Sequence, residues 1–223
     1  MITKDYSAFF KELAKNNEKA WFHANKKRYE THVKMPFLAL LEQLLDTLIQ
    51  WDCRMVPDPK KAVFRINRDI RFSKDKSPYN TIMKAGFSPG GRKSELPGYY
   101  LGIDADQVHV GGGLFMASPE VLKKVRFSIA ENIKGLENLV EDKNFKTTFG
   151  PLQGEKSKRL DKSLLAAAEK SDLIYHKQFY VFTKFPLSDF YGSTKLFDEV
   201  RKHFELVRPL NHYFDHVFQQ QTQ

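Results

Sequence analysis

The sequence has few of the features that mark secreted, membrane-spanning or thiolate-metal proteins. It contains a single cysteine, Cys53, among 223 residues, which excludes an intramolecular disulfide and a cage of cysteine metal ligands. The longest apolar run, residues 35–41, is far shorter than a membrane span, and the first residues lack the apolar segment of a signal peptide. We therefore expect a soluble, cytoplasmic protein with no membrane partner.

Acidic residues are outnumbered, and internal repeats and low-complexity segments are lacking. The 36 lysines and arginines against 27 aspartates and glutamates give a formal net charge of +9, which favours anionic partners such as nucleotides, nucleic acids or phosphorylated metabolites. Basic clusters at residues 26–28, 60–61 and 156–159 are scattered, as solvated faces usually are. With 41% hydrophobic residues the chain can form a substantial core, and we expect a single domain over residues 1–223.

Apolar residues recur with helical spacing in the first part of the chain. Thr3 can cap a helix that stops near Asn16, and a long amphipathic stretch follows, in which Pro36 must kink the helix or begin it afresh. Two prolines in residues 56–61 end this pattern. Residues 1–55 are therefore predicted to be helical.

Alternating and β-branched residues dominate after residue 62. They predict strands at residues 63–73, 81–87, 98–104 and 107–114, and their short connections indicate antiparallel pairing. A further strand is predicted at residues 145–149. Residues 179–185 are apolar on both faces, which is typical of a strand buried within a sheet.

Helical patterns return in the last part of the chain. Ser118 and Pro119 predict the start of a helix that ends at Gly135, residues 163–170 predict a short helix, and Ser193 can cap a terminal helix that Pro209 should bend. Residues 118–223 thus combine helices with one or two strands, and residues 62–115 form the β-rich part. The pattern predicts an α+β fold, with a mostly antiparallel sheet of about five to six strands flanked by N-terminal, central and C-terminal helices.

Residues 64–79, called the Arg-rich segment below, hold the densest charge in the sequence. Its basic residues are Arg65, Arg68, Arg71, Lys74 and Lys76, and its acidic residues are Asp69 and Asp75. Because guanidinium and ammonium groups bind phosphates and carboxylates, this segment predicts a site for an anionic ligand.

Arg68 departs from the two-residue period of this segment. Read as a strand, the segment places Arg68 on the same side as Ile66 and Ile70, where an unpaired buried guanidinium would cost about 3–5 kcal/mol. Arg68 could form an internal ion pair, could reach into a pocket beside Arg71 as a planar fork for an anion, or could be moved to the polar side by a β-bulge. The sequence leaves all three open, with the candidate partners being Asp104, Glu131 and Glu42 and the candidate bulge lying near Asn67.

Three further motifs carry two interpretations each. Ser73 and Lys76 have the Ser-x-x-Lys spacing of acyl-transfer enzymes, but a turn that closes a strand explains them better, since no second motif of such enzymes accompanies them. Glycines at residues 111–113 precede a predicted helix start and suggest a phosphate-binding loop, whereas glycines inside a strand more often mark a bulge or a close backbone approach. His212 and His216 have the spacing of a metal-binding pair or of a solvated or packing pair.

Aromatic residues beside the Arg-rich segment offer a last pattern. Tyr79, Tyr99 and Tyr100 could form a stacking platform for single-stranded nucleic acid, although aromatics at alternating strand positions are more often core. No helix-turn-helix, RRM or KH signature is present.

Four stretches carry a family resemblance. They are Asn-Asn-Glu-Lys-Ala-Trp-Phe-His-Ala-Asn-Lys from residue 16, the whole Arg-rich segment, Gly-Tyr-Tyr-Leu from residue 98 and Gly-Gly-Gly-Leu from residue 111. With them the chain resembles a family of uncharacterised bacterial and fungal proteins known as domain of unknown function 2461. The resemblance implies a single-domain protein of about this length and brings no activity, cofactor or catalytic residue. Relatives tend to have a His-Pro stretch after a Lys-Arg pair, and its lack after Lys158-Arg159 argues against a mechanism with a histidine there.

The leading hypothesis is a small-molecule site, binding or catalytic, at the Arg-rich segment. In it Arg68 and Arg71 clamp an anion, Asp69 orients them or acts as a base, and Tyr79 lines the site with its hydroxyl, while Arg65, Lys74 and Lys76 add positive charge. The first alternative is a nucleic-acid-binding module in which Lys60, Lys61, Arg65, Lys74 and Lys76 contact the backbone, and the second is a purely structural role. The sequence predicts no metal and no cofactor, and it assigns neither a reaction nor an oligomeric state.

Overall fold

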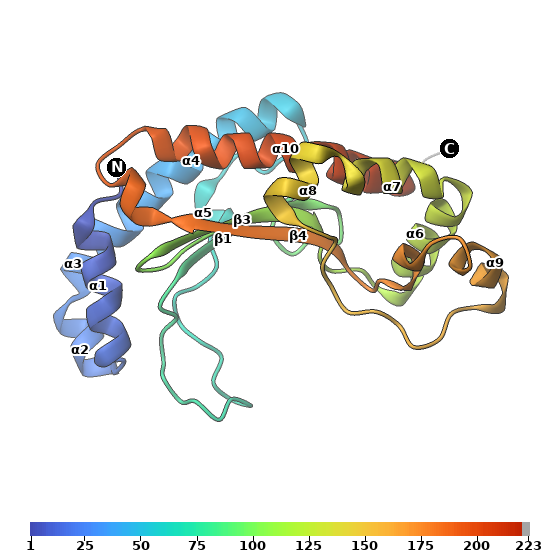
Figure 1. Cartoon of the computed structure of the whole chain (residues 1–223). Helices are drawn as coiled ribbons and strands as arrows, with labels where there is room; N and C mark the ends of the chain where they lie inside the picture. The colour runs from blue at the N-terminus through green and yellow to red at the C-terminus, as the bar shows by residue number, and fades with distance from the viewer. Residues whose placement is uncertain (220–223) are drawn as a thin grey trace.

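The computed structural model describes residues 1–219, with helices at both ends of the chain and a sheet between them (Figure 1). Within those residues one antiparallel sheet forms, with the order β1-β2-β3-β4. Its strands are β1 (Met83–Phe87), β2 (Gly98–Ile103), β3 (Gln107–Leu114) and β4 (Phe179–Pro186). The predicted α+β class is confirmed, and the predicted number of five to six strands is wrong because the described sheet has four.

The N-terminal part is helical, as predicted. It holds α1 (Lys4–Lys15), α2 (Lys19–Ala24), α3 (Lys26–Arg28), a π-helical turn (Tyr29–Lys34), α4 (Met35–Trp51) and the short α5 (Pro59–Ala62). The Thr3 side chain accepts the amide hydrogen of Asp5, and Asn16 ends α1. Pro36 lies in the first turn of α4, directly after the π-helical turn, and Lys34 and Met35 keep helical backbone angles. The helix therefore changes its hydrogen-bond pattern before Pro36 and does not begin afresh there.

The C-terminal part is also mainly helical. It holds α6 (Pro119–Glu131), α7 (Ile133–Glu141), α8 (Lys143–Phe149), α9 (Leu165–Ala168), α10 (Lys195–Gln219) and 3₁₀ turns at Lys162–Leu164, Asp172–Tyr175 and Leu187–Phe190. Ser118 caps α6 as predicted, but that helix stops at Asn132 and not at Gly135, because the Asn132 side chain accepts the Gly135 amide and starts α7. Pro209 lies inside α10, which continues past it.

Two predicted strands are wrong. Residues 145–149 belong to α8, where the Asp142 side chain caps the helix and Phe145 and Phe149 face the core. Residues 63–73 form no regular strand and leave the sheet after an isolated bridge between Val63 and Ala85. The Arg-rich segment instead runs out and back as an extended loop, coloured teal between α5 and β1 in Figure 1, and the side chain of Phe72 in it is 95% exposed.

The two faces of the sheet differ. Helices α4 and α10 lie along one face, where Leu101, Val110 and Val181 are fully buried, whereas the Arg-rich segment extends from the side of the other face (Figure 1). Strand β4 is an edge strand and not the interior strand expected from its apolar residues. None of the helices in residues 1–219 is long and apolar enough to cross a membrane.

Glycines in β3 allow the strands and α10 to approach one another closely. A β-carbon on Gly112 would lie 2.3 Å from the Gly98 carbonyl oxygen and 2.8 Å from Cγ1 of Val207 in α10, and one on Gly111 would lie 1.9 Å from the Val181 carbonyl oxygen. These glycines therefore serve the close backbone approach that the sequence offered as one explanation, and they lie inside a strand and not in a phosphate-binding loop.

We expect Gly111→Ala to lower the free energy of unfolding by about 2 kcal/mol or more, because its methyl group would collide with backbone atoms that cannot move without breaking the sheet. Gly86→Ala is the matched control, on β1 in the same cross-strand row as Gly111. Its methyl group would meet only side-chain atoms, the ring of Phe64 at 3.3 Å and Cβ of Arg92 at 3.5 Å, so the expected loss is below about 1 kcal/mol. Urea unfolding measures both, and equal stability of the two variants would contradict this account.

Candidate ligand-binding groove

The sheet face that carries no helix is the floor of a cavity of about 690 Å³, called the groove below. Three cross-strand rows follow from the strand register. The first row is Lys84, Gly102, His109 and Lys184; the second is Gly86, Tyr100, Gly111 and Phe182; the third is Gly98, Gly113 and Tyr180. The groove therefore has a cationic end, an aromatic middle and a floor opened by glycines.

Aromatic rings form a continuous line in the groove. Tyr100 lies 4.9 Å from Phe182, Phe182 lies 5.0 Å from Tyr180, and Tyr180 lies 5.0 Å from Phe115, all measured between ring centroids. Burial raises the pKa of Tyr100 to about 12, so its hydroxyl stays neutral and can donate a hydrogen bond. Such a line of half-buried rings is suited to stacking against a flat ligand.

The charged lining of the groove is of one sign. Of the described residues that line it, Lys84, Arg92, His109 and Lys184 are basic, and none is aspartate or glutamate. Arg92 lies over the ring of Phe64, with 5.8 Å from its central carbon to the ring centroid. Asp104 lies against His109, but no described carboxylate of the lining neutralises Lys84, Arg92 or Lys184, so the groove favours an anion.

His109 is held in place from behind. Its Nε2 lies 2.7 Å from Oδ2 of Asp104, and Asp104 also accepts the backbone amides of Asp106 and Gln107. Burial opposes ionisation of Asp104, but the hydrogen bonds from His109 and these amides prevail and lower its pKa. The ionised carboxylate makes Nε2 the donor, which leaves Nδ1 of His109 available to a ligand or a proton.

The Arg-rich segment lies at the β1 edge of the groove. Its first residue, Phe64, lines the groove, and the amide of Phe64 donates to the Lys84 carbonyl at 2.8 Å. Burial is the main reason that the pKa of Lys84 is lowered, and the positive charge of Arg68 adds to it. The Arg68 guanidinium therefore acts electrostatically on the cationic end of the groove.

Arg68 itself is paired within its own loop. It binds the Asp75 carboxylate, donates to the Ser77 carbonyl at 3.2 Å, and keeps 24% of its side chain exposed. The expected partners Asp104, Glu131 and Glu42 are wrong, and a β-bulge at Asn67 is not needed because residues 63–73 are not a regular strand. The expectation that the Arg68 guanidinium needs a negatively charged partner is met by Asp75, seven residues further along the chain.

The other predicted site residues of the segment are exposed. Asp69 receives two hydrogen bonds from the Arg71 side chain, and Lys76 donates to the Ile70 carbonyl at 3.0 Å. Arg65 and Lys74 are exposed, and none of these residues lines the groove. Lys76 is thus directed to the backbone of its own loop, which favours the turn interpretation of Ser73 and Lys76 over an acyl-transfer pair.

Tyr79 is placed differently from the expectation of a ligand-lining hydroxyl. Its side chain is 5% exposed and stacks on Phe22, with 4.0 Å between ring centroids, while its backbone is held by the Asn17 side chain. Tyr99 also faces the core, against Phe204 at 4.9 Å. Of the three tyrosines considered for a stacking platform, only Tyr100 is on the open face.

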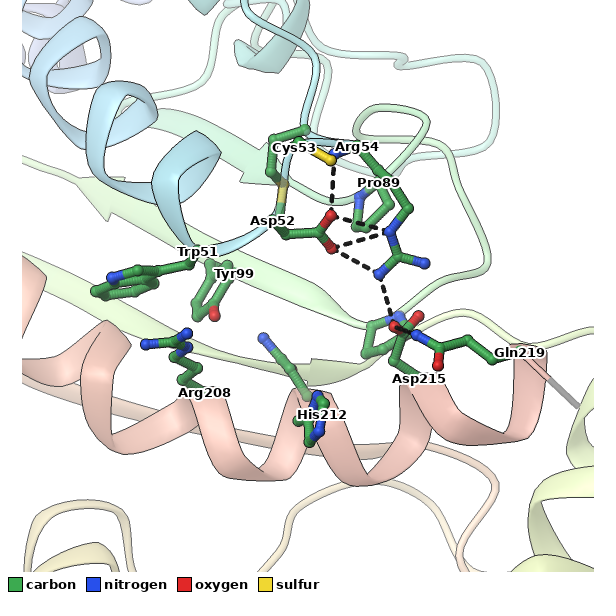
Figure 2. Close-up of a pocket in the computed structure, with 13 residues that line it drawn as sticks. Trp51, Asp52, Cys53, Arg54, Pro89, Tyr99, Arg208, His212, Asp215 and Gln219 are labelled. Atoms are coloured by element: carbon green, nitrogen blue, oxygen red, sulfur yellow. Dashed lines mark hydrogen bonds and ion pairs between the residues drawn. The ribbon is translucent and has the colours of Figure 1, made fainter.

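A second cavity, of about 600 Å³, lies between the end of α4 and α10 (Figure 2). Figure 2 shows the Arg54 guanidinium between the carboxylates of Asp52 and Asp215, each 2.6 Å from its Nη2 atom. Arg208 lies over the Trp51 ring at 5.0 Å. Because Arg54 is already neutralised by protein carboxylates, this cavity is a weaker candidate for an anion than the groove.

Metal binding has little geometric support in the part of the chain that is described. His212 and His216 lie 4.4 Å apart between ring centroids, both exposed on α10, and no group of three or more histidine, cysteine, aspartate or glutamate side chains in residues 1–219 could hold a metal ion.

The family model described as conserved hypothetical protein (DUF2461) matches residues 5–213, which is nearly the whole chain. The chain belongs to this family. Membership of the DUF2461 family confirms the resemblance seen in the sequence, and the family description carries no activity. A search of curated proteins gave no match.

Sequence reasoning missed most of the groove. Four residues of the groove lie in strands that the sequence predicts, namely Lys84, His109, Phe182 and Lys184. Only the register of the strands shows that these four residues are on the same face of the sheet. One signal of the groove was present in the sequence. Residues 179–185 carry aromatic rings on both faces of the strand, and the rings on the face away from the helices belong to the groove.

We expect Asp215→Asn to lower the free energy of unfolding by about 1–3 kcal/mol, because the buried carboxylate accepts from Arg54 at 2.6 Å and from Gln219 at 2.8 Å. Glu205→Gln on the same helix is the control, since its pair with Arg201 is largely exposed and should contribute below about 1 kcal/mol. Chemical unfolding compares them, and a loss no larger than the control's would contradict the structural role of the Arg54 pair.

Proposed function

We propose that this DUF2461 protein binds a small anionic molecule with a flat ring, such as a nucleoside phosphate or an aromatic carboxylate, in the groove. The observation that carries the proposal is the lining itself, which joins four basic side chains to a line of neighbouring aromatic rings and includes no carboxylate among the described residues. A volume of about 690 Å³ falls in the range of ordinary small-molecule sites.

Each part of the lining has a role in the proposal. The ring of the ligand stacks on Tyr100 and Phe182 over the glycine floor, and its anionic group meets Lys84, Arg92 or Lys184. The Tyr100 hydroxyl and His109 Nδ1 supply neutral hydrogen-bonding groups that fix its orientation. The specificity for a flat anion thus comes from two different contacts, one with the aromatic middle of the groove and one with its basic side chains.

The Arg-rich segment keeps part of its predicted role in this proposal. Arg65, Arg68, Arg71, Lys74 and Lys76, partly offset by Asp69 and Asp75, supply a positive field at the β1 edge that attracts the ligand. Arg68 and Arg71 are already bound to carboxylates of their own loop, so direct clamping of an anion would require those pairs to open. Tyr79 has no part in it.

We expect nucleoside phosphates or aromatic carboxylates to raise the melting temperature in a thermal-shift panel, because a ligand that binds only the folded state stabilises it. Arg92→Glu and Lys184→Glu should each weaken the binding of a responding compound about tenfold, since each places a negative charge in the groove. Affinities are measured by calorimetry.

Lys93→Glu is the matched control, because Lys93 is exposed beside Arg92 and does not line the groove. It makes the same change in net charge and should leave the affinity within about twofold, apart from long-range effects that salt screens. If Lys93→Glu weakens binding as much as Arg92→Glu, net charge and not the groove explains the affinity.

The nucleic-acid alternative predicts a different dependence on length and salt. A single-stranded oligonucleotide bound through several phosphates should bind more tightly as it lengthens and should lose affinity steeply as salt rises. We expect instead that a mononucleotide binds as tightly as a ten-nucleotide strand, to within about threefold per site. A large gain with length, measured by fluorescence anisotropy, would replace the small-molecule proposal by a nucleic-acid-binding module.

A further inference from the structure

The first row of the groove contains an amine in an unusual environment. Lys84 lies in the middle of β1, lines the groove beside Phe64 and Tyr100, and forms no ion pair with any carboxylate in residues 1–219. The other lysine of the row, Lys184, is exposed on the edge strand β4. A lysine that is half-buried among rings and unpaired is in the setting that favours the neutral, nucleophilic amine.

Burial and one nearby positive charge set the environment of the Lys84 amine. The other basic residues that line the groove are Arg92, His109 on β3 and Lys184 on β4, and the neutral hydroxyl of Tyr100 lies among them. Asp104, behind His109, is engaged by that ring and by two backbone amides. Burial, with Arg68 next in importance, lowers the pKa of Lys84, which increases the share of neutral amine at neutral pH.

A proton acceptor is available in the same row. Lys84 and His109 both pair with Gly102, so their backbones stand two strand spacings apart, about 10 Å. The Tyr100 side chain lies over Gly102, where a β-carbon would be 2.8 Å from its hydroxyl oxygen, so this neutral hydroxyl stands between the two residues. His109 donates to Asp104 through Nε2, which leaves Nδ1 to take or return a proton in the groove.

We propose that Lys84 is a reactive amine that forms an imine with the carbonyl group of an anionic, ring-bearing aldehyde or ketone bound in the groove. The neutral Nζ attacks the carbonyl carbon, a proton moves from nitrogen to the former carbonyl oxygen, and the resulting carbinolamine loses that oxygen as water. An amine and a carbonyl compound thus become an imine and one water molecule, with no oxidant or reductant. The inference rests on the proposed function, since the groove must first hold the ligand.

Pyridoxal 5′-phosphate is a suitable probe because it joins an aromatic ring, a phosphate and an aldehyde. The full chain is incubated with an equimolar amount of the probe at pH 7.5, the imine is reduced with borohydride, and the labelled peptides are quantified by mass spectrometry. We expect Lys84 to be labelled at least tenfold more than Lys184 or Lys93. Labelling spread evenly over exposed lysines, with no excess at Lys84, would overturn the proposal.

Two sets of variants separate reactivity from folding. Lys84→Arg and Lys84→Gln should each abolish the excess labelling while the melting temperature stays within a few degrees of the wild type. Arg68→Ala should shift the pH profile of Lys84 labelling to higher pH without changing its plateau, because removing a nearby positive charge makes the ammonium form easier to keep. An unchanged profile would show that the environment described here does not govern the amine.

Pyridoxine 5′-phosphate, which has an alcohol in place of the aldehyde, distinguishes this proposal from the groove proposal. If it raises the melting temperature while pyridoxal 5′-phosphate leaves Lys84 unlabelled, the groove proposal stands and the reactive amine is wrong. If neither effect is seen, both are wrong for ligands of this class. Selective labelling of Lys84 supports the reactive amine in either case.

Discussion

The groove depends on the close contact between α10 and the middle of the sheet. Gly112 makes that contact possible, because any side chain there would collide with Val207 of α10 and with the neighbouring strand. Once α10 and α4 cover one face, the apolar residues of that face are buried and the other face needs no further cover to stabilise the fold. The residues of the open face are therefore free to serve a ligand.

The groove differs from the other clusters of basic residues in having no described carboxylate that pairs with its lysines and its arginine. In the cavity of Figure 2, Arg54 is held by Asp52 and Asp215, and in the Arg-rich segment Arg68 and Arg71 are held by Asp75 and Asp69. In the groove, Lys84, Arg92 and Lys184 share the lining with no described carboxylate. The basic side chains of the groove repel one another, which costs free energy, and a bound anion would offset that repulsion.

Local signals in the sequence predicted much of the fold. The caps at Thr3 and Ser118 and the three consecutive strands β1, β2 and β3 follow from residue chemistry within a few positions. The errors arose where two signals conflict. Phe145 and Phe149 have a spacing of four that a helix also buries, and Asp142 supplies a cap that decides for the helix. Residues 63–73 alternate like a strand but leave the sheet.

The candidate site was predicted only in part, for a similar reason. The proposed ligand class follows from the density of basic residues, whereas the groove follows from the register of four strands, which spacing along the chain does not contain. A buried Arg68 on a strand would need a partner from elsewhere in the fold. Because the segment is a loop, Arg68 reaches Asp75 within the same segment instead. The single-domain organisation, the cytoplasmic location and ligand binding by the Arg-rich segment stay predictions.

The most direct measurement of the central claim is a crystal structure of the protein soaked with a nucleoside phosphate or aromatic carboxylate that raises its melting temperature. The account predicts a ring stacked on Tyr100 and Phe182, with the anionic group within hydrogen-bond distance of Lys84, Arg92 or Lys184. A ligand found instead in the cavity of Figure 2, or on the Arg-rich segment with an empty groove, would contradict it.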